Sequence, residues 1–348
     1  MLSPFKIFPF GALLLGLLTA CSQPAQEHQH SSLHFGTLID ITLYDVEQKT
    51  AEAAFAQLDQ NFSYWHSAWS PWQPGSLRRA NSLIKTGHAF SVGPSIMPLI
   101  ERSTELAEQT DNLFNPAIGE LINLWQFHKH DEPDIAPPAA ADIEALVAQQ
   151  PLMSDLQIDG IKMLSHNPTV SLNFGAFAKG YAIDLQIQLL KDMGIDNAII
   201  NTGGDLKAIG QHGDRPWRVA IRHPRLDDWL AYIDTRGEES IFTSGDYERG
   251  YTHNNQYYHH ILDPRTGYPA MQTQSVTVLH HDSGLADAAA TALFVAGPED
   301  WLRIARKLGI KNAMLVDQQG VVHITPGMQQ RVVFNPQIET TIAVTAAL

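Results

Sequence analysis

An aspartate and a threonine stand four positions apart in the segment GLADAAATALF, at Asp287 and Thr291. If this segment is a helix, both side chains point from one of its faces. A carboxylate and a hydroxyl offer oxygen ligands to a hard cation such as Mg²⁺, which usually keeps waters and phosphate oxygens as its other ligands. An exposed polar stripe has the same spacing, so the spacing alone leaves both interpretations open. The flanking alanines add weight to the cation site, because they allow another backbone to approach closely.

A second group of reactive side chains lies in the segment HHILDPRTGYP, which runs from residue 259 to residue 269. On a strand, His260 and Leu262 share one face, whereas His259 and Asp263 lie on the other. Histidine ionises near neutral pH, so His260 could accept a proton from an attacking hydroxyl group. The alternative is a structural turn in which Arg265 pairs with Asp263, and the two interpretations are compatible.

Two glycine-containing junctions could hold an anion. In NFGAFAKGYAID, Gly175 permits unusual backbone dihedrals, and a helix that begins here would direct free amides and Lys179 toward a ligand. A plain joint with a surface lysine fits this segment equally well. In NTGGD, residues 201–205, a glycine pair follows an apolar strand and could bring backbone amides close to a phosphate. An ordinary turn has the same residues.

Composition limits the class of protein. The chain has 348 residues, 44% of them hydrophobic and 17% charged, which is typical of a globular protein. Its formal net charge of −14 argues against nucleic acid as a partner, because phosphate binding along a duplex needs a basic face. A phosphorylated small ligand remains compatible with this charge if a metal ion or backbone amides offset it.

The elements that must position these residues are strands and helices that do not alternate strictly, which favours an α+β fold over a doubly wound sheet. Apolar periodicity and turn residues predict a strand at 35–44, helices at 50–70, 94–110 and 115–128, a hairpin at 160–174 that turns at 166–168, and helices at 175–194 and 283–297. Pro94 suits a first helical turn, Asn115 suits an N-cap, and Gly194 suits a helix end.

The N-terminal region predicts export. Residues 1–20 carry one early positive charge and an apolar run too short to span a bilayer, as in a lipoprotein signal peptide. Cys21, the only cysteine in the chain, ends the sequence LTAC, which resembles a bacterial lipobox. The alternative is a cleaved signal with an incidental cysteine. We expect residues 21–32 to be a flexible tether and residues 33–348 to form the domain, with no disulfide and no thiolate chemistry.

Taken together and in this order, FNPAIGELINLWQF, GAFAKGYAID, INTGGD, TSGDYERG, HHILDPRTGYP and ADAAATALFVAG resemble blocks of the ApbE family, the FAD:protein FMN transferases. The resemblance begins near Phe35 and covers nearly the whole predicted domain. It implies an ApbE-like fold of mixed, mainly antiparallel sheets packed with helices. It also implies a Mg²⁺-dependent reaction in which a threonine or serine hydroxyl of a target protein attacks FAD, AMP leaves, and FMN stays attached through a phosphoester.

The resemblance assigns roles to individual residues of this chain. Asp287 and Thr291 match metal-binding side chains, Ala176 matches a position that would offer its backbone carbonyl to the metal, and His260 matches the proposed base. The positions expected to line FAD are Phe35, Trp69, Leu113, Phe114, Asn115, Asn173, Lys179 and Leu262. Trp69 would stack on a flavin or adenine ring. Asn173 is a departure, because the family usually has aspartate there and an amide cannot supply the same charge.

Partners and location follow from the same resemblance. We expect FAD as substrate and a flavin-accepting envelope protein, such as a subunit of a redox pump, as the second substrate. A lipid on Cys21 would hold the protein to a membrane on the periplasmic side of the bacterial envelope, more often the inner membrane. Two alternatives stay open: an FAD pyrophosphatase that uses water and yields FMN and AMP, and a non-catalytic flavin-binding lipoprotein, for which Asn173 is the argument.

Overall fold

The computed structural model describes residues 26–127 and 135–347. The predicted signal peptide at residues 1–20 and the predicted lipid site at Cys21 lie outside the described residues. No helix in the described parts of the chain is both long and apolar enough to cross a bilayer.

A nine-stranded sheet forms the centre of the fold, and all of its neighbouring strands are antiparallel except the last pair, β15 and β17. In spatial order its strands are β1 (Glu27–His34), β2 (Thr37–Tyr44), β6 (Ala198–Thr202), β7 (Asp205–Ile209), β10 (Glu239–Gly245), β13 (Thr273–His280), β14 (Asn312–Asp317), β15 (Val322–Ile324) and β17 (Ile342–Val344). This arrangement confirms the α+β class and the mainly antiparallel pairing.

Three small antiparallel sheets surround the large one. They are β11 (Gly250–His253) with β12 (Gln256–His259); β16 (Val332–Phe334), β9 (Trp229–Asp234) and β8 (Arg218–Arg222); and β3 (Phe90–Ser91), β5 (Lys162–Ser165) and β4 (Leu156–Asp159). The helices are α1 (Gln48–Ala68), α2 (Ser76–Ile84), α3 (Met97–Gln109), α4 (Gly119–Trp125), α5 (Ala140–Ala148), α6 (Ala178–Asp192), α7 (Ser283–Lys307) and α8 (Pro326–Gln329), with a short 3₁₀ turn at Met153–Asp155.

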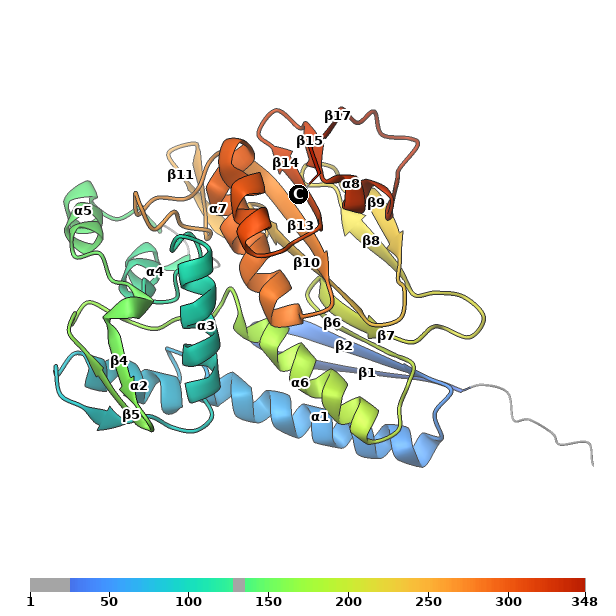
Figure 1. The fold of residues 1–348 in the computed structure, drawn as a ribbon, viewed down its shortest axis with the longest axis horizontal. Coiled ribbons are helices and arrows are strands. Elements are labelled where there is room, and N and C mark those ends of the chain that lie inside the picture. The colour runs from blue at the N-terminus through green and yellow to red at the C-terminus, as the bar shows by residue number, and fades with distance from the viewer. Residues whose placement is uncertain (1–25, 128–134, 348) are drawn as a thin grey trace, which may run out of the picture.

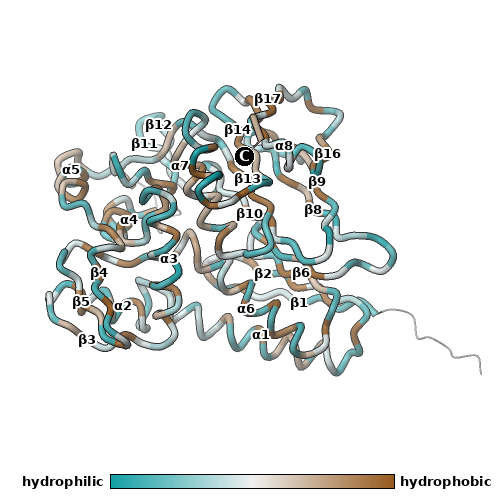
Figure 2. Tube along the Cα trace, viewed as in Figure 1, coloured by the Kyte–Doolittle hydropathy of each residue, from teal (hydrophilic) through white to brown (hydrophobic). Residues whose placement is uncertain are grey.

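The large sheet is covered on both faces, because successive side chains of a strand point to opposite sides. In β10, Phe242 belongs to the core that lies beneath α6 and α7, whereas Ile241 packs with residues of β8 and β9 on the other face. Figure 1 shows α6 and α7 lying across one face of the sheet, and Figure 2 shows hydrophobic segments along its strands with hydrophilic segments in the outer loops.

The predicted tether at residues 21–32 is too long, and the structure corrects it. Strand β1 begins at Glu27 and pairs with β2 along its full length, from Glu27 with Tyr44 to His34 with Thr37. Its inward side chains are polar but still pack on α1, where the His30 ring stacks on Phe55 at a centroid distance of 5.1 Å. A strand whose inner face is mostly histidine and serine has no apolar period, so its sequence resembles a solvated linker.

Three predicted boundaries also move. The helix expected from Pro94 begins at Met97 and has Pro98 in its first turn, and the helix expected from Asn115 begins at Gly119. The hairpin of β4 and β5 turns at Gly160, where φ is +56°, and not at residues 166–168. The predicted helix end at Gly194 is confirmed by its left-handed φ of +77°.

Candidate functional site

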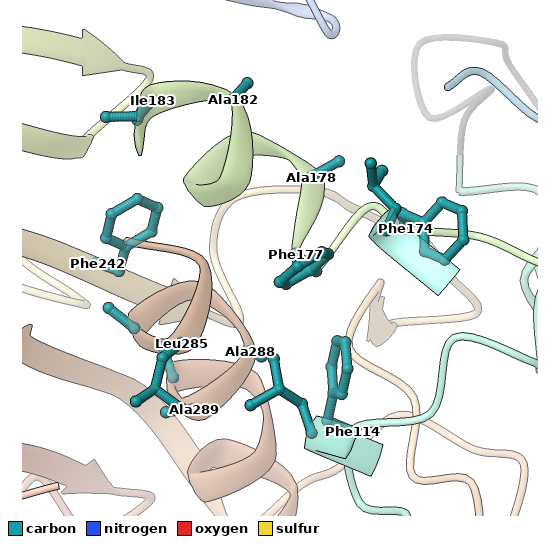
Figure 3. Close-up of a cluster of buried hydrophobic side chains, with 14 of the residues drawn as sticks. Phe114, Phe174, Phe177, Ala178, Ala182, Ile183, Phe242, Leu285, Ala288 and Ala289 are labelled. Carbon is teal, nitrogen blue, oxygen red and sulfur yellow. The ribbon is translucent and has the colours of Figure 1, made fainter. Parts of the chain in front are cut away.

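The site is built where α6 and α7 cross. Figure 3 shows Phe177, at the start of α6, lying toward Ala288 of α7, with Phe114 nearby. The helices approach closely because α6 has a glycine at the contact: a Cβ on Gly180 would lie 2.2 Å from the carbonyl oxygen of Ser283. Small residues at this crossing therefore bring the main chain of α6 against the first turns of α7.

Asp287 lies in this crossing and is 5% exposed. Its Oδ2 accepts a hydrogen bond of 3.1 Å from the backbone amide of Gly180. Burial raises the pKa of the Asp287 carboxyl to about 7, against the attraction of Lys179, and the negative charge of Asp205 raises it further. Among the described residues no other group donates to this carboxylate. The position therefore holds an acceptor whose negative charge is poorly balanced.

Thr291 lies one helical turn beyond Asp287 and is half-buried. Its hydroxyl is 3.2 Å from the hydroxyl of Ser244 at the end of β10. The predicted helix at 283–297 is confirmed, and α7 continues to Lys307 with a kink at Gly297, where φ is +72° and ψ is 174°. Ala176, the third predicted metal position, is half-buried immediately before α6 and packs against the main core.

Lys179 forms an ion pair with Asp205, the aspartate that ends the glycine turn after β6. The second carboxylate oxygen of Asp205 accepts the backbone amide of Thr243 at 3.0 Å. Burial alone would lower the pKa of Lys179, but the carboxylates of Asp205 and Asp287 outweigh burial and raise it. Lys179 is therefore a protonated ammonium group between two acidic side chains. Asp205 was not predicted as a site residue, and the NTGGD turn was the only signal in the sequence.

The two neighbouring histidines have different surroundings. His259 is 1% exposed, its Nε2 lies 3.0 Å from the carbonyl oxygen of Ala270, and its ring meets Phe294 edge-on. His260 is half-buried, and its Nδ1 donates to the carbonyl oxygen of Arg249 at 3.2 Å. The contacts of His259 are therefore structural, whereas His260 is the candidate for the catalytic base.

The His260 ring is unprotonated at neutral pH. Burial, with the positive charge of Arg249 and the neighbouring His259, lowers its pKa to about 3, so the ring is neutral at physiological pH. Because the Arg249 carbonyl only accepts hydrogen bonds, Nδ1 carries the hydrogen and Nε2 keeps its lone pair. A neutral imidazole with one unprotonated nitrogen can accept a proton from a hydroxyl group.

The rest of HHILDPRTGYP forms a rigid turn. Arg265 and Asp263 form the ion pair that the sequence suggested, at 2.7 Å, and Asp263 also accepts the backbone amide of Arg265 at 2.9 Å. Leu262 is buried and forms an isolated bridge with Pro269. The structural interpretation of this segment is confirmed, and the role of His260 as a base stays a prediction.

Aromatic rings cluster where the hairpin of β1 and β2 meets the end of α1. Phe35 adopts a left-handed φ of +53°, and its backbone amide donates to Nδ1 of His66 at 2.9 Å. The Trp69 ring is 5% exposed and lies parallel to the rings of Trp65, at 5.0 Å, and Phe35, at 6.2 Å. Trp69 already has aromatic neighbours, so its stacking on a flavin or adenine ring stays a prediction.

The remaining predicted FAD-lining residues are mostly packed inside the fold. Leu113 and Phe114 are buried in the main core. Asn115 accepts the backbone amide of Ala117 at 3.0 Å and donates to the carbonyl of Pro151 at 2.9 Å. Asn173 accepts the backbone amide of Gly175 at 2.9 Å and so shapes the turn that leads into α6. Contact with FAD stays a prediction for all four residues.

Two further features of the described residues concern where a ligand could bind. Within residues 26–127 and 135–347, no group of three or more His, Cys, Asp or Glu side chains could hold a metal ion. An open hollow of about 670 Å³ lies along α1 and the loop before α2, but no predicted site residue lines it.

Comparison with known proteins defines the class. Residues 35–315 match the ApbE family, and the chain belongs to this family. It is 38% identical over 321 residues to the FAD:protein FMN transferase of Rhodobacter capsulatus, covering 92% of this chain and 61% of that protein. It is 28% identical to the FAD:protein FMN transferase of Vibrio cholerae, covering 86% of this chain and 90% of that one.

Solved structures agree with this assignment. The ApbE protein of Thermotoga maritima superposes with a TM-score of 0.80 at 27% identity, covering 88% of this chain and 99% of that one. The apo form of the flavinyl transferase ApbE of Pseudomonas stutzeri gives a TM-score of 0.76 at 28% identity, covering 88% and 97%. The ApbE-like fold expected from the sequence is confirmed.

Proposed function

We propose that this protein is an FAD:protein FMN transferase, which moves FMN from FAD to a threonine or serine hydroxyl of a target protein and releases AMP. The observation that carries the proposal is the family match, which spans every segment of the site from Phe35 to Thr291. Relatives that match most of this chain carry that activity in their names. The neutral His260 and the buried Asp287 provide the groups that such a reaction needs.

The proposed transfer needs no reactant besides FAD and the target hydroxyl. The hydroxyl oxygen of the target forms a new bond to the FMN-side phosphorus, the phosphoanhydride bond of FAD breaks, and the leaving oxygen departs with AMP. Nε2 of His260 takes the hydroxyl proton, because this nitrogen keeps its lone pair while Nδ1 donates to Arg249. Lys179 lies in the first turn of α6, and its ammonium pairs with the carboxylate of Asp205. Positive charge at this helix start would attract the negative charge of a pyrophosphate.

Mg²⁺ is the second part of the proposal, with Asp287, Thr291 and the carbonyl of Ala176 as its protein ligands. The fit rests on Asp287, a buried carboxylate whose only donor among the described residues is one backbone amide and whose pKa is raised to about 7. A bound cation would balance the negative charge of this carboxylate and of a pyrophosphate.

Asn173 does not favour the non-catalytic alternative. Its side chain accepts the Gly175 amide in the turn before α6, a task that an aspartate oxygen would also perform. Asparagine at this position is therefore compatible with the turn, with the carboxylate of Asp287 and with the proposed base. Hydrolysis of FAD by water needs the same groups as transfer, so only an experiment with an acceptor separates those two reactions.

We further propose that a lipid on Cys21 holds the protein on the periplasmic side of the bacterial envelope, where its acceptor would be found. Support comes from the signal-like residues 1–20 and the LTAC sequence. With β1 beginning at Glu27, the tether would consist of residues 22–26 only. A subunit of a membrane redox pump is the acceptor class that fits this location.

The test uses purified protein that begins at Ser22, because a shorter form starting at Ser32 would lose most of β1. The protein is incubated with FAD, Mg²⁺ and an envelope protein from the same genome, and the acceptor's intact mass is recorded. A gain of one FMN less water, abolished by chelator and by Asp287→Ala, would establish transfer. AMP without any gain in acceptor mass would identify a pyrophosphatase, and bound FAD without AMP would identify a binding protein.

A further inference from the structure

Helices α6 and α7 cap each other through two carboxylates. Asp287 of α7 accepts the amide of Gly180, which belongs to the first turn of α6. Asp184 of α6 accepts the amides of Ser283, at 2.8 Å, and Gly284, at 3.2 Å, which belong to the first turn of α7. The first amides of a helix have no partner within it, so each helix supplies the acceptor that the other lacks.

The two contacts are in register. Gly180 and Asp184 are four residues apart on α6, and Ser283 and Asp287 are four residues apart on α7, so both ties lie on facing sides of the two helices. Because residue 180 meets 287 and residue 184 meets 283, the helices run antiparallel past each other at this crossing. A shift of one helix along the other would break both ties at once.

Asp184 is itself held in place. Its Oδ1 accepts from the Lys207 ammonium at 2.7 Å, and Lys207 is only 4% exposed. The same ammonium donates to the carbonyl oxygen of His281 at 2.7 Å and contacts Oε1 of Glu238 at 2.8 Å. Lys207 of β7 therefore fixes the Asp184 carboxylate, which in turn binds the first amides of α7. The same lysine binds the carbonyl of His281, in the segment that leads into α7.

We infer that Asp184 is a positioning residue for metal binding, which holds α7 in the register that sets the Asp287 carboxylate and the Thr291 hydroxyl against the start of α6, near Ala176. The inference rests on the proposed function, in which these two side chains bind the cation. Asp184 differs from the cap that α7 supplies itself: Asp282 accepts the amide of Leu285 at 2.7 Å, whereas the Ser283 and Gly284 amides are bound from another helix. Asp184 adds a tie to a different helix.

The experiment measures Mn²⁺ binding to the purified protein without FAD, by the electron paramagnetic resonance signal of free Mn²⁺. Asp184→Ala is expected to weaken binding at least about tenfold, as for other residues that orient metal ligands. Asp184→Asn, which keeps one oxygen for the two amides but loses the oxygen that accepts from Lys207, should recover part of the affinity. At saturating Mg²⁺ the rate of FMN transfer by Asp184→Ala should approach that of the wild type. The substitution lowers the affinity for the metal but leaves the base, His260, unaltered.

Asp282→Ala is the matched control, since it removes a capping carboxylate from the same end of α7 but leaves the ties to α6 intact. It should lower the melting temperature while leaving Mn²⁺ affinity near the wild-type value. Equal loss of Mn²⁺ affinity in Asp282→Ala and Asp184→Ala would overturn the inference and reduce Asp184 to a stabilising cap. If Asp184→Ala does not fold, Asp184→Ser takes its place, because its shorter side chain cannot reach both amides, and the same loss is expected.

The same titrations separate this inference from the proposed function. If the wild type and Asp287→Ala bind Mn²⁺ alike, the metal assignment itself is wrong. If Asp287→Ala loses binding while Asp184→Ala binds as the wild type does, the metal site stands and the positioning role of Asp184 is refuted.

Discussion

Replacement of Gly180 by alanine should disable the site without replacing any reactive side chain, and the new Cβ would also come within 3.0 Å of the Cβ of Asp287. The added Cβ would lie 2.2 Å from the Ser283 carbonyl oxygen and 2.6 Å from its carbonyl carbon. Ordinary contacts are about 3.5–4.0 Å, so α6 and α7 would have to separate by more than about 1 Å. Both obstructing atoms belong to the backbone, so no side chain can rotate away to relieve the clash.

The size of the effect follows from that displacement. Overpacking of this kind costs about 1–3 kcal/mol of stability, partly offset by about 1 kcal/mol because alanine favours a helix more than glycine does. The stability loss is therefore modest. A displacement of about 1 Å at a reacting centre can slow a reaction about 100-fold, equivalent to about 2.7 kcal/mol in the activation barrier. Gly180→Ala should therefore lose far more activity than stability.

The assay compares AMP release and acceptor flavinylation with the melting temperature of the same preparation. Gly93→Ala is the control, because its Cβ would meet only side-chain atoms of Ser76, the nearer at 3.1 Å, and Gly93 lies outside the predicted site. Full turnover in a folded Gly180→Ala variant would refute the reasoning, since α7 could then move away from α6 without consequence for the chemistry.

The remaining predictions concern the reactive groups. Asp287→Ala should abolish Mg²⁺-dependent turnover, and normal Mg²⁺-dependent activity in this variant would contradict the metal assignment. His260→Ala should slow FMN transfer by about 10²–10⁴-fold while FAD binding, followed by flavin fluorescence, is unchanged; loss of FAD binding would make His260 a binding residue. The pKa of His260 is about 3 in the folded protein, against a reference value of 6.5. Between these pH values the unfolded chain binds one proton more than the folded chain. The free energy of unfolding therefore falls as pH decreases through that window. The melting temperature of the wild type should therefore fall more steeply below pH 6.5 than that of His260→Gln, and parallel curves would argue against the lowered pKa.

Much of the fold could be predicted from local patterns. The helix that closes at Gly194 and the helix at 283–297 are long apolar segments with glycine stop signals, and both form. Strand β1 could not be predicted, because its inner face is polar and its stability comes from pairing with β2 and packing on α1. The helix starts moved by three or four residues, since prolines and asparagines near a start favour several positions.

The site could be predicted only in part. His260, Asp287 and Thr291 stand in segments with recognisable spacing, and family resemblance assigned their roles. The contact of Gly180 with Asp287 joins residues 107 apart in the chain, and that of Asp184 with Ser283 joins residues 99 apart. Neither contact has a local signal, because each depends on how two helices cross. Asp205, which pairs with Lys179, was missed for the same reason.

The early start of β1 also limits how far the protein can reach. With a lipid on Cys21, as proposed, residues 22–26 extend at most about 18 Å from the membrane, at the maximum span of an extended chain. The eight residues of β1 add about 26 Å before the hairpin tip at Phe35. The hairpin tip therefore lies within roughly 45 Å of the bilayer surface. An acceptor that reaches the FAD predicted to lie at Phe35 would therefore have to do so inside that layer, so height above the membrane would limit the choice of substrate.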